Sequence, residues 1–190
     1  MINVDKNTFL DINLKAINKN YKIIKQIVGR KCIIAATVKA NAYGLGADQV
    51  VNSLIKKGCK YFFVATTNEA IYLRKLNKRI FIFILNGLVT KELKNIRKFN
   101  LIPVINNLAQ LKKIENYQKE NNCFLNIAIH FDTGMSRLGL DQNETENLIK
   151  NKALLIKKSK LRLIMSHLSC ADDKKSKLNK IQLNKFNFIK

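Results

Sequence analysis

The feature that most limits the fold of this chain is a regular alternation of short, uninterrupted apolar runs with longer amphipathic stretches. Each run has the length of a β-strand, and the runs cover residues 32–38, 61–65, 80–85, 101–104, 125–131 and 161–165. Strands that are apolar along their whole length are typical of a parallel sheet covered by helices. The alternation therefore predicts an α/β fold of about six βα units.

The stretches between these runs carry apolar residues at helical spacing. The first stretch predicts a helix that ends at Gly29, because steps of three or four residues separate Leu14, Ile17, Tyr21, Ile24 and Val28. Later helices are predicted to begin after the candidate N-caps Thr90, Asn107 and Asp141, the last with Glu144 in the spacing of a capping box. A final helix is expected from about Ile181.

Periodicity alone does not distinguish a doubly wound sheet from a β/α barrel, since both repeat the βα unit. A complete eightfold barrel usually needs about 250 residues, and this chain has 190. Six units in that length make most of a barrel, with two units missing. We therefore expect residues 1–190 to form one domain, an incomplete (β/α)8 barrel of the TIM type.

The net charge of +22 raises the question of nucleic-acid binding. Lysine supplies nearly all of this charge, whereas arginine, which reads bases and grips phosphates with two hydrogen bonds, occurs six times. The lysines are spread over every polar face, and aromatic platforms for stacking bases are lacking. We therefore expect a solvated cationic surface that attracts polyanions only non-specifically, with no specific nucleic-acid partner.

Other signals bear on location and on metals. No apolar run is long enough to cross a bilayer, and residues 1–11 lack the basic flank and apolar stretch of a secretory signal. We expect a cytoplasmic protein with no membrane partner. No C-x-x-C pair or zinc spacing is present, so we expect no metal and four reduced thiols, several of them buried, at Cys32, Cys59, Cys123 and Cys170.

A lysine follows directly on the first apolar run. Chemistry in β/α folds is placed at the C-terminal ends of the strands, and Lys39 stands at such an end. Burial of an amine favours its neutral form, the nucleophile that bonds to carbonyl groups. Tyr43 lies four residues on and can reach the same site, and Gly44 and Gly46 allow a tight turn. By itself, a lysine after a strand is usually only a capping charge.

Two further polar segments follow the fifth and sixth runs. The first reads H-F-D-T-G-M-S-R-L-G, beginning at His130 and containing Arg137, and the second reads M-S-H-L-S-C-A-D-D and contains His167. Each has a purely structural interpretation as well. Arg137 could pair with Asp132 in a local turn, and a histidine next to an apolar strand is more often a packing residue than a functional one.

Taken in order, these segments resemble those of the alanine racemase family. V-K-A-N-A-Y-G-x-G, which begins at Val38, resembles its attachment signature for pyridoxal 5'-phosphate (PLP). The segments around Arg137 and His167 are similar to its D-T-G-M-x-R-L-G and T-H-x-x-x-A-D/E segments, and residues 9–17 resemble its opening strand and first helix. The resemblance runs from about Phe9 to the last residue and implies the N-terminal barrel of a two-domain enzyme, with the C-terminal β domain absent.

The resemblance also implies residue roles. The enzyme is a PLP-dependent isomerase that interconverts L-alanine and D-alanine and supplies D-alanine for cell-wall peptidoglycan. Lys39 would bind PLP covalently and Tyr43 would hydrogen-bond its phosphate. Arg137 would lie beside the ring and place the substrate, and His167 would pack on the pyridine ring. The full-length form is expected to be a homodimer in which a tyrosine of the C-terminal domain serves as the second base.

One residue departs from the family. Many members carry a carbamate-modified lysine where His130 stands, and that carbamate pairs with the arginine. Histidine cannot form it, so Arg137 has to be oriented in another way. With two strands and a domain missing, the chain is expected to be inactive alone. The alternative is a single-domain PLP-binding carrier protein without racemase activity, against which the segments at Arg137 and His167 favour the racemase.

Overall fold

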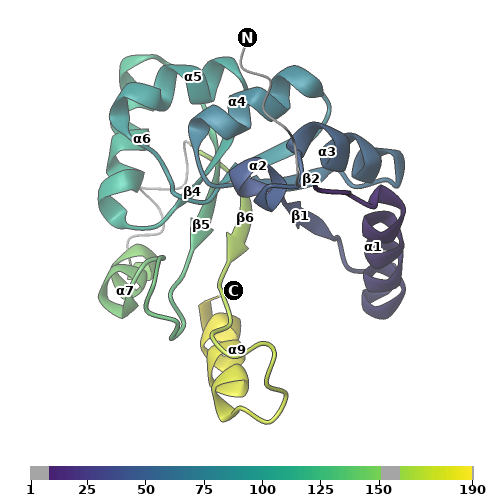
Figure 1. Cartoon of the computed structure of the whole chain (residues 1–190). Coiled ribbons are helices and arrows are strands. Elements are labelled where there is room, and N and C mark those ends of the chain that lie inside the picture. Colours follow the sequence, from purple (N-terminus) through teal and green to yellow (C-terminus); the bar gives the residue numbers. More distant parts are fainter. Residues whose placement is uncertain (1–8, 151–158, 190) are drawn as a thin grey trace.

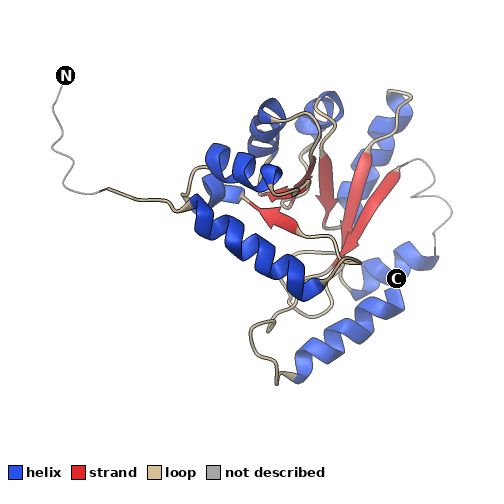
Figure 2. Cartoon of the chain, turned by 90° about the vertical axis from the view of Figure 1, so that its right-hand side faces the viewer, coloured by secondary structure: helices blue, strands red, loops and turns tan. Residues whose placement is uncertain are grey.

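The computed structural model describes residues 9–150 and 159–189, and its centre is a sheet of six parallel strands (Figures 1 and 2). The strands are β1 (Ala35–Thr37), β2 (Tyr61–Val64), β3 (Phe81–Ile84), β4 (Ile102–Ile105), β5 (Asn126–His130) and β6 (Lys160–Met165). Each of the six predicted runs overlaps one strand. The largest difference in boundary is at β1, which begins at Ala35 rather than at Cys32.

The order of the strands decides between the two candidate architectures. It is sequential from β1 to β6, and every neighbouring pair is parallel. A doubly wound sheet would reverse its strand order at a switch point, whereas a barrel adds each strand beside the last. Among the described residues, β1 and β6 each have a neighbour on one side only. The fold is therefore the incomplete (β/α)8 barrel that the sequence predicts.

The helices follow the strands, and most of them cover the outer side of the sheet (Figures 1 and 2). They are α1 (Leu14–Val28), α2 (Lys39–Tyr43), α3 (Ala47–Lys56), α4 (Thr67–Leu76), α5 (Leu93–Lys98), α6 (Leu108–Glu120), α7 (Gln142–Lys150) and α9 (Lys177–Ile189). The last helix begins at Lys177 rather than near Ile181. It lies beyond the end of β6, apart from the helices that cover the sheet (Figure 1).

Successive residues along the strands face two different clusters, as the two-residue period of a strand requires. The larger cluster joins the sheet to its helices and includes Phe62, Ile82 and Ile127. The smaller one includes Phe83 and Val104, on the opposite face. A fully buried side chain of this size contributes roughly 1.5–3 kcal/mol to stability. This packing fixes the strands, and with them the loops at their C-terminal ends.

Two of the predicted helix caps are present, one of them in altered form. The Oδ1 atom of Asn107 accepts a hydrogen bond from the Gln110 N–H at 2.9 Å, which caps α6. The Oδ1 atom of Asp141 accepts from the Glu144 N–H at 2.8 Å. Glu144 does not complete the capping box, because its Oε1 atom accepts from the Leu108 N–H at 2.8 Å instead. This carboxylate therefore ties the N-terminus of α6 to α7.

Three smaller expectations were wrong. Residues 9–13 form no strand, although they resemble the opening strand of the family. Thr90 begins a short 3-10 turn before α5 and makes no side-chain cap. Only one of the four thiols is buried, that of Cys59, while Cys32 is exposed and the other two are intermediate.

Candidate functional site

Lys39 stands at the start of a left-handed helical turn, α2. The φ angle is 49° at Ala40, 54° at Asn41, 56° at Ala42 and 56° at Tyr43. Each such residue costs about 1–2 kcal/mol, and left-handed residues other than glycine usually occur singly. A run of four persists only where surrounding contacts hold it, and strain of this kind concentrates at functional sites.

The left-handed turn is held by hydrogen bonds from within and from outside. Inside it, the Ala42 N–H donates to the Val38 carbonyl at 3.0 Å and the Gly44 N–H donates to the Ala40 carbonyl at 2.9 Å. The Asn41 Oδ1 atom accepts from the N–H of Ala47, the first residue of α3, at 2.8 Å. The turn after β1 is thus fastened to the helix that follows it.

The carboxylate of Glu69 fastens the same turn to the neighbouring strand. Its Oε1 atom accepts from the Ala40 N–H at 2.7 Å, and its Oε2 atom accepts from the Ala65 and Thr66 N–H groups at 2.8 and 3.0 Å. The Thr66 hydroxyl accepts from the Glu69 N–H at 3.3 Å, which completes a capping box at α4. One side chain therefore joins the residue after Lys39 to the end of β2.

Replacing Glu69 by glutamine is expected to destabilise the protein by about 2 kcal/mol, because hydrogen bonds to charged groups contribute about 1.5–3 kcal/mol. The new amide nitrogen cannot accept, so one oxygen remains for three N–H donors. Urea denaturation measures the change in the free energy of unfolding. The matched control is Glu120→Gln, which removes an equal charge from an exposed position. Equal effects of the two substitutions would contradict the role of Glu69.

The Lys39 amine lies beside the ring of Tyr43, with 5.8 Å between Nζ and the ring centroid. The Lys39 side chain is only partly buried by the described residues, so it keeps some contact with solvent. Tyr43 is 62% exposed. The two residues that the sequence places at one site are therefore neighbours, on the turn that follows β1.

Arg137 lies in the loop after β5, which is closed by backbone hydrogen bonds between its two ends. The Leu140 N–H donates to the His130 carbonyl at 2.8 Å, and the Asp132 N–H donates to the Leu140 carbonyl at 2.9 Å. The Oδ1 atom of Asp132 accepts from three backbone N–H groups at 2.9, 2.9 and 3.0 Å, those of Gly134, Met135 and Ser136. Although burial raises it, these hydrogen bonds bring the pKa of Asp132 below its usual value.

The carboxylate of Asp132 is therefore occupied by its own turn rather than by Arg137. Within residues 9–150 and 159–189, the structure gives the exposed guanidinium of Arg137 no hydrogen bond or salt bridge. A cation without a partner at this position is free to bind an anionic group.

The two histidines lie next to one another, with ring centroids 6.4 Å apart. His130 is 5% exposed and its Nδ1 atom lies 3.0 Å from the Oδ1 atom of Asn106. Burial lowers the pKa of His130, and the charges of His167 and Arg137 lower it further against an opposing effect of Asp132. Both rings are therefore biased toward the neutral form.

Positive charge gathers around His167. Burial lowers the pKa of His167, and the charges of Arg137 and Lys39 lower it further. This coupling shows that the ends of β1, β5 and β6 bring Lys39, Arg137 and the two imidazoles within electrostatic range of one another. Tyr43 joins the group through its contact with Lys39. No cluster of three or more His, Cys, Asp or Glu side chains suited to a metal is found in the part of the chain described.

Some supporting residues of this site were not predicted from the sequence. Asn106 is 6% exposed, and its Nδ2 group donates to the Leu85 and Val104 carbonyls at 2.9 and 3.1 Å, which turns Oδ1 toward His130. Nothing in its local sequence indicates this contact. Glu69 stands three residues after Thr66, a spacing that does indicate a capping box, although not the bond to Ala40.

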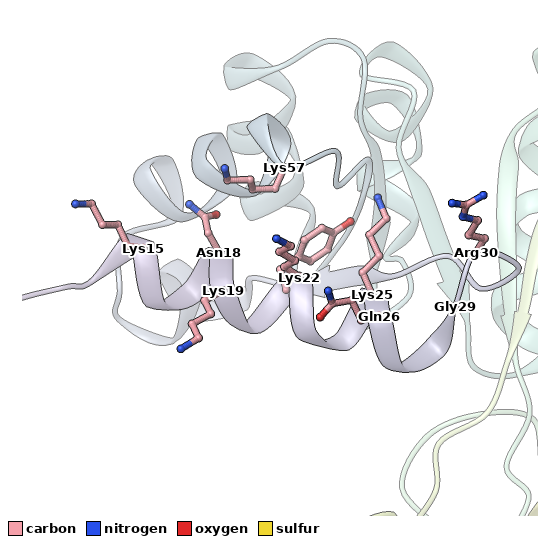
Figure 3. A pocket seen from close by; sticks show the side chains of 10 residues that line it. Lys15, Asn18, Lys19, Lys22, Lys25, Gln26, Gly29, Arg30 and Lys57 are labelled. Carbon is pink, nitrogen blue, oxygen red and sulfur yellow. The ribbon is translucent and has the colours of Figure 1, made fainter.

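A hollow of the described surface lies elsewhere, along α1 (Figure 3). Its volume is about 930 Å³, and none of the site residues predicted from the sequence lines it. Its lining includes lysines and an arginine but no acidic residue, namely Lys15, Lys19, Lys22, Lys25, Arg30 and Lys57. It belongs to the cationic surface rather than to the site around Lys39. None of the helices in the described ranges has the length and apolar character needed to cross a bilayer.

Comparison with known proteins places this geometry in a family. The family described as "Alanine racemase, N-terminal domain" matches residues 12–190. The alanine racemase of Rickettsia prowazekii (strain Madrid E) is 43% identical over 178 residues, which cover 93% of this chain and 44% of that protein. The chain spans about half or less of the length of the curated relatives it matches.

Solved structures agree with the sequence relatives. The alanine racemase of Bartonella henselae, a structure with covalently bound pyridoxal phosphate, superposes with a TM-score of 0.89 at 35% identity over 94% of this chain and 52% of that one. The biosynthetic alanine racemase of Pseudomonas aeruginosa gives a TM-score of 0.81 at 32% identity over 93% of this chain and 48% of that one. The match of the family model over residues 12–190, nearly the whole chain, on the barrel described above, means that this chain belongs to the alanine racemase family.

Proposed function

We propose that residues 1–190 form the PLP-binding barrel domain of an alanine racemase, an isomerase that interconverts L-alanine and D-alanine. The observation that carries the proposal is the Lys39 amine, held on a strained left-handed turn within electrostatic range of His167. The product would serve peptidoglycan synthesis in the cytoplasm. In its full-length form we expect a homodimer.

The residues of the site fit PLP as a ligand. An aldehyde requires a primary amine, and Lys39 supplies one at the end of β1. A phosphate requires cations and hydroxyl groups, which Arg137 and Tyr43 carry at exposed positions. Two carboxylates of this end of the barrel already accept backbone hydrogen bonds, Asp132 from three N–H groups at Oδ1 and Glu69 from three others. Burial lowers the pKa of His167 first, and the charges of Arg137 and Lys39 lower it further, so an anionic ligand would be attracted by these two cations.

PLP, when bound, supplies an electron sink for the negative charge left at the α-carbon of an amino acid when its proton is removed. Lys39 would hold the cofactor through a covalent bond from Nζ, and Nζ would carry a proton to or from the substrate once that bond is released. Arg137 would bind the substrate carboxylate, and Tyr43 would donate its hydroxyl hydrogen to the cofactor phosphate. His167, kept neutral, would present a flat uncharged face to the cofactor ring.

Racemisation needs proton transfer on both faces of the α-carbon, so it needs two bases. Lys39 can serve one face. We propose that the other base belongs to a part of the enzyme outside residues 1–190, and that the isolated chain exchanges an α-proton without inverting the centre. The alternative function, a PLP carrier, would hold the cofactor at Lys39 and leave amino acids unchanged.

The test incubates the purified chain with PLP and alanine in deuterium oxide. We expect slow exchange of the α-proton of one alanine enantiomer, measured by NMR, and no D-alanine from L-alanine on chiral chromatography. Free PLP and PLP with the Lys39→Ala chain are the controls. Absence of exchange above both controls would favour the carrier, and net racemisation by the chain alone would contradict the need for an external base.

A further inference from the structure

Gln182 is the buried polar residue of α9, a helix whose other described side chains are exposed or only partly buried. Its side chain is 1% exposed. A buried amide is costly unless all of its hydrogen-bonding groups have partners. The hydrogen-bond partners of Gln182 therefore indicate its structural role at the C-terminal end of the barrel.

Four hydrogen bonds satisfy this amide completely. Its Nε2 group donates to the His167 carbonyl at 2.8 Å and to the Thr133 Oγ1 atom at 3.1 Å. Its Oε1 atom accepts from the Ser169 N–H at 2.9 Å and from the Ser169 hydroxyl at 3.0 Å. A carbonyl can only accept and an N–H can only donate, so the orientation of the amide is fixed by its backbone partners.

These bonds link three segments that are distant in the sequence. Thr133 belongs to the loop after β5 that carries Arg137, and its hydroxyl lies 2.6 Å from that of Ser166 at the end of β6. His167 and Ser169 belong to the segment after β6. Gln182 binds the His167 carbonyl and the Ser169 N–H, which lie on either side of Leu168. It therefore fixes the backbone conformation of the segment that carries the His167 ring.

We propose that Gln182 is a positioning residue, which fixes His167 and the Arg137 loop relative to one another by clamping the backbone after β6 to Thr133. The inference rests on the proposed function, in which His167 and Arg137 face the cofactor. It assigns to α9 a role in the site, although none of its side chains is among the residues predicted to bind PLP. The clamp acts through backbone groups, so the sequence around His167 does not reveal it.

The test uses Gln182→Met, which keeps the length of the side chain and removes all four hydrogen bonds. The matched control is Asn184→Met, which removes an exposed amide from the same helix. Because the chain contains two histidines, ¹⁵N-histidine labelling yields signals from two imidazole rings, assigned with a His130→Asn variant. In Gln182→Met we expect the His167 ring to titrate closer to its usual pKa, since a loosened segment moves this exposed residue away from the desolvation and from the charges of Arg137 and Lys39 that lower its pKa. The pKa of His130 is lowered first by its own burial and only then by the charge of His167, so the His130 ring should shift less.

Two further measurements accompany the titration. Hydrogen exchange at the Ser169 amide should accelerate at least tenfold in Gln182→Met and stay unchanged in the control. The concentration of PLP needed for half-maximal attachment at Lys39 should rise at least tenfold. Gln182→Glu keeps the two acceptor bonds to Ser169 and loses both donors, so it should keep the Ser169 amide protected while releasing His167. It also serves as the test variant if Gln182→Met does not fold.

The outcomes separate this inference from the proposed function. If the parent chain binds no PLP, the proposed function fails, while the His167 titration and the Ser169 exchange still decide the role of Gln182. If His167 titrates as in the parent in both Gln182 variants, the positioning role is refuted. Equal changes at His130 and His167 would mean a general loosening of the fold and would refute it as well.

Discussion

Replacing Lys39 by alanine is expected to abolish specific covalent attachment of PLP to this chain. The amine at the end of β1 is the nucleophile of the proposed site, and alanine leaves the left-handed turn with no group that can bond an aldehyde. The substitution leaves the hydrogen bonds that hold the turn in place, because these come from backbone groups, Asn41 and Glu69. The loss should therefore be chemical rather than structural.

The measurement has to distinguish Lys39 from the many surface lysines, since PLP reacts with any exposed amine. PLP near equimolar with the chain, borohydride reduction and peptide mapping by mass spectrometry locate the adduct. In the parent chain we expect it at Lys39 well above every other lysine, and in Lys39→Ala no lysine should replace it. Lys57→Ala, at an exposed position in the cationic hollow, is the control and should keep the adduct. Uniform labelling of the parent would contradict the site.

Replacing Gly139 by alanine is expected to lower the free energy of unfolding by roughly 3–5 kcal/mol, the sum of backbone strain and overpacking. The φ angle of Gly139 is 111°, in a region that residues with a side chain rarely adopt. A Cβ atom would lie 2.7 Å from the Asp132 nitrogen and 2.9 Å from the Phe131 carbonyl carbon. Both are backbone atoms of the closed loop that carries Arg137, so a change of side-chain rotamer cannot relieve the clash.

Gly58→Ala is the matched control for this substitution. Gly58 also has a positive φ, 91°, but a Cβ atom there would have no atom within 4 Å. Its cost should therefore be about 1–2 kcal/mol, from the conformation alone. Urea denaturation of both variants, with circular dichroism as the probe, gives the two free energies. If Gly139→Ala lowers the free energy of unfolding no more than Gly58→Ala does, the loop that carries Arg137 is packed less tightly than the structure indicates.

The positions of strands could be predicted because burial on both faces leaves a continuous apolar run, and all six runs overlap a strand. Caps were predicted less well, because a carboxylate in the right spacing can bind elsewhere. Glu144 has the spacing of a capping box, yet its carboxylate accepts from Leu108 on another helix. Local spacing indicates which groups can meet, and tertiary contacts decide which of them do.

For the site, the sequence indicated which side chains carry chemistry but not what holds them. Lys39, Arg137 and His167 follow strands whose C-terminal ends meet at one edge, so their proximity could be expected. Only the structure excluded the alternative pairing of Arg137 with Asp132, since the described residues show no salt bridge between them and Asp132 Oδ1 accepts from three backbone N–H groups. Asn106 and Gln182 were not predicted, because their contacts in the site are with residues distant in the sequence. Asn106 contacts His130, 24 residues away, and Gln182 contacts Ser169 and His167, 13 and 15 residues away.

The sequence by itself determined the βα repeat, the strand positions and the family, because these depend on local periodicity and on short contiguous motifs. Periodicity did not distinguish a barrel from a doubly wound sheet, and the tertiary structure confirmed the barrel that the chain length and the family resemblance predicted, since strand order depends on pairing between distant segments. Only the tertiary structure decided the left-handed turn at Lys39, which no propensity favours. That conformation is held by Asn41, which accepts a hydrogen bond from Ala47 of α3, and by Glu69 of α4, which accepts one from Ala40. The contact with Glu69 forms only when β1 and β2 are side by side.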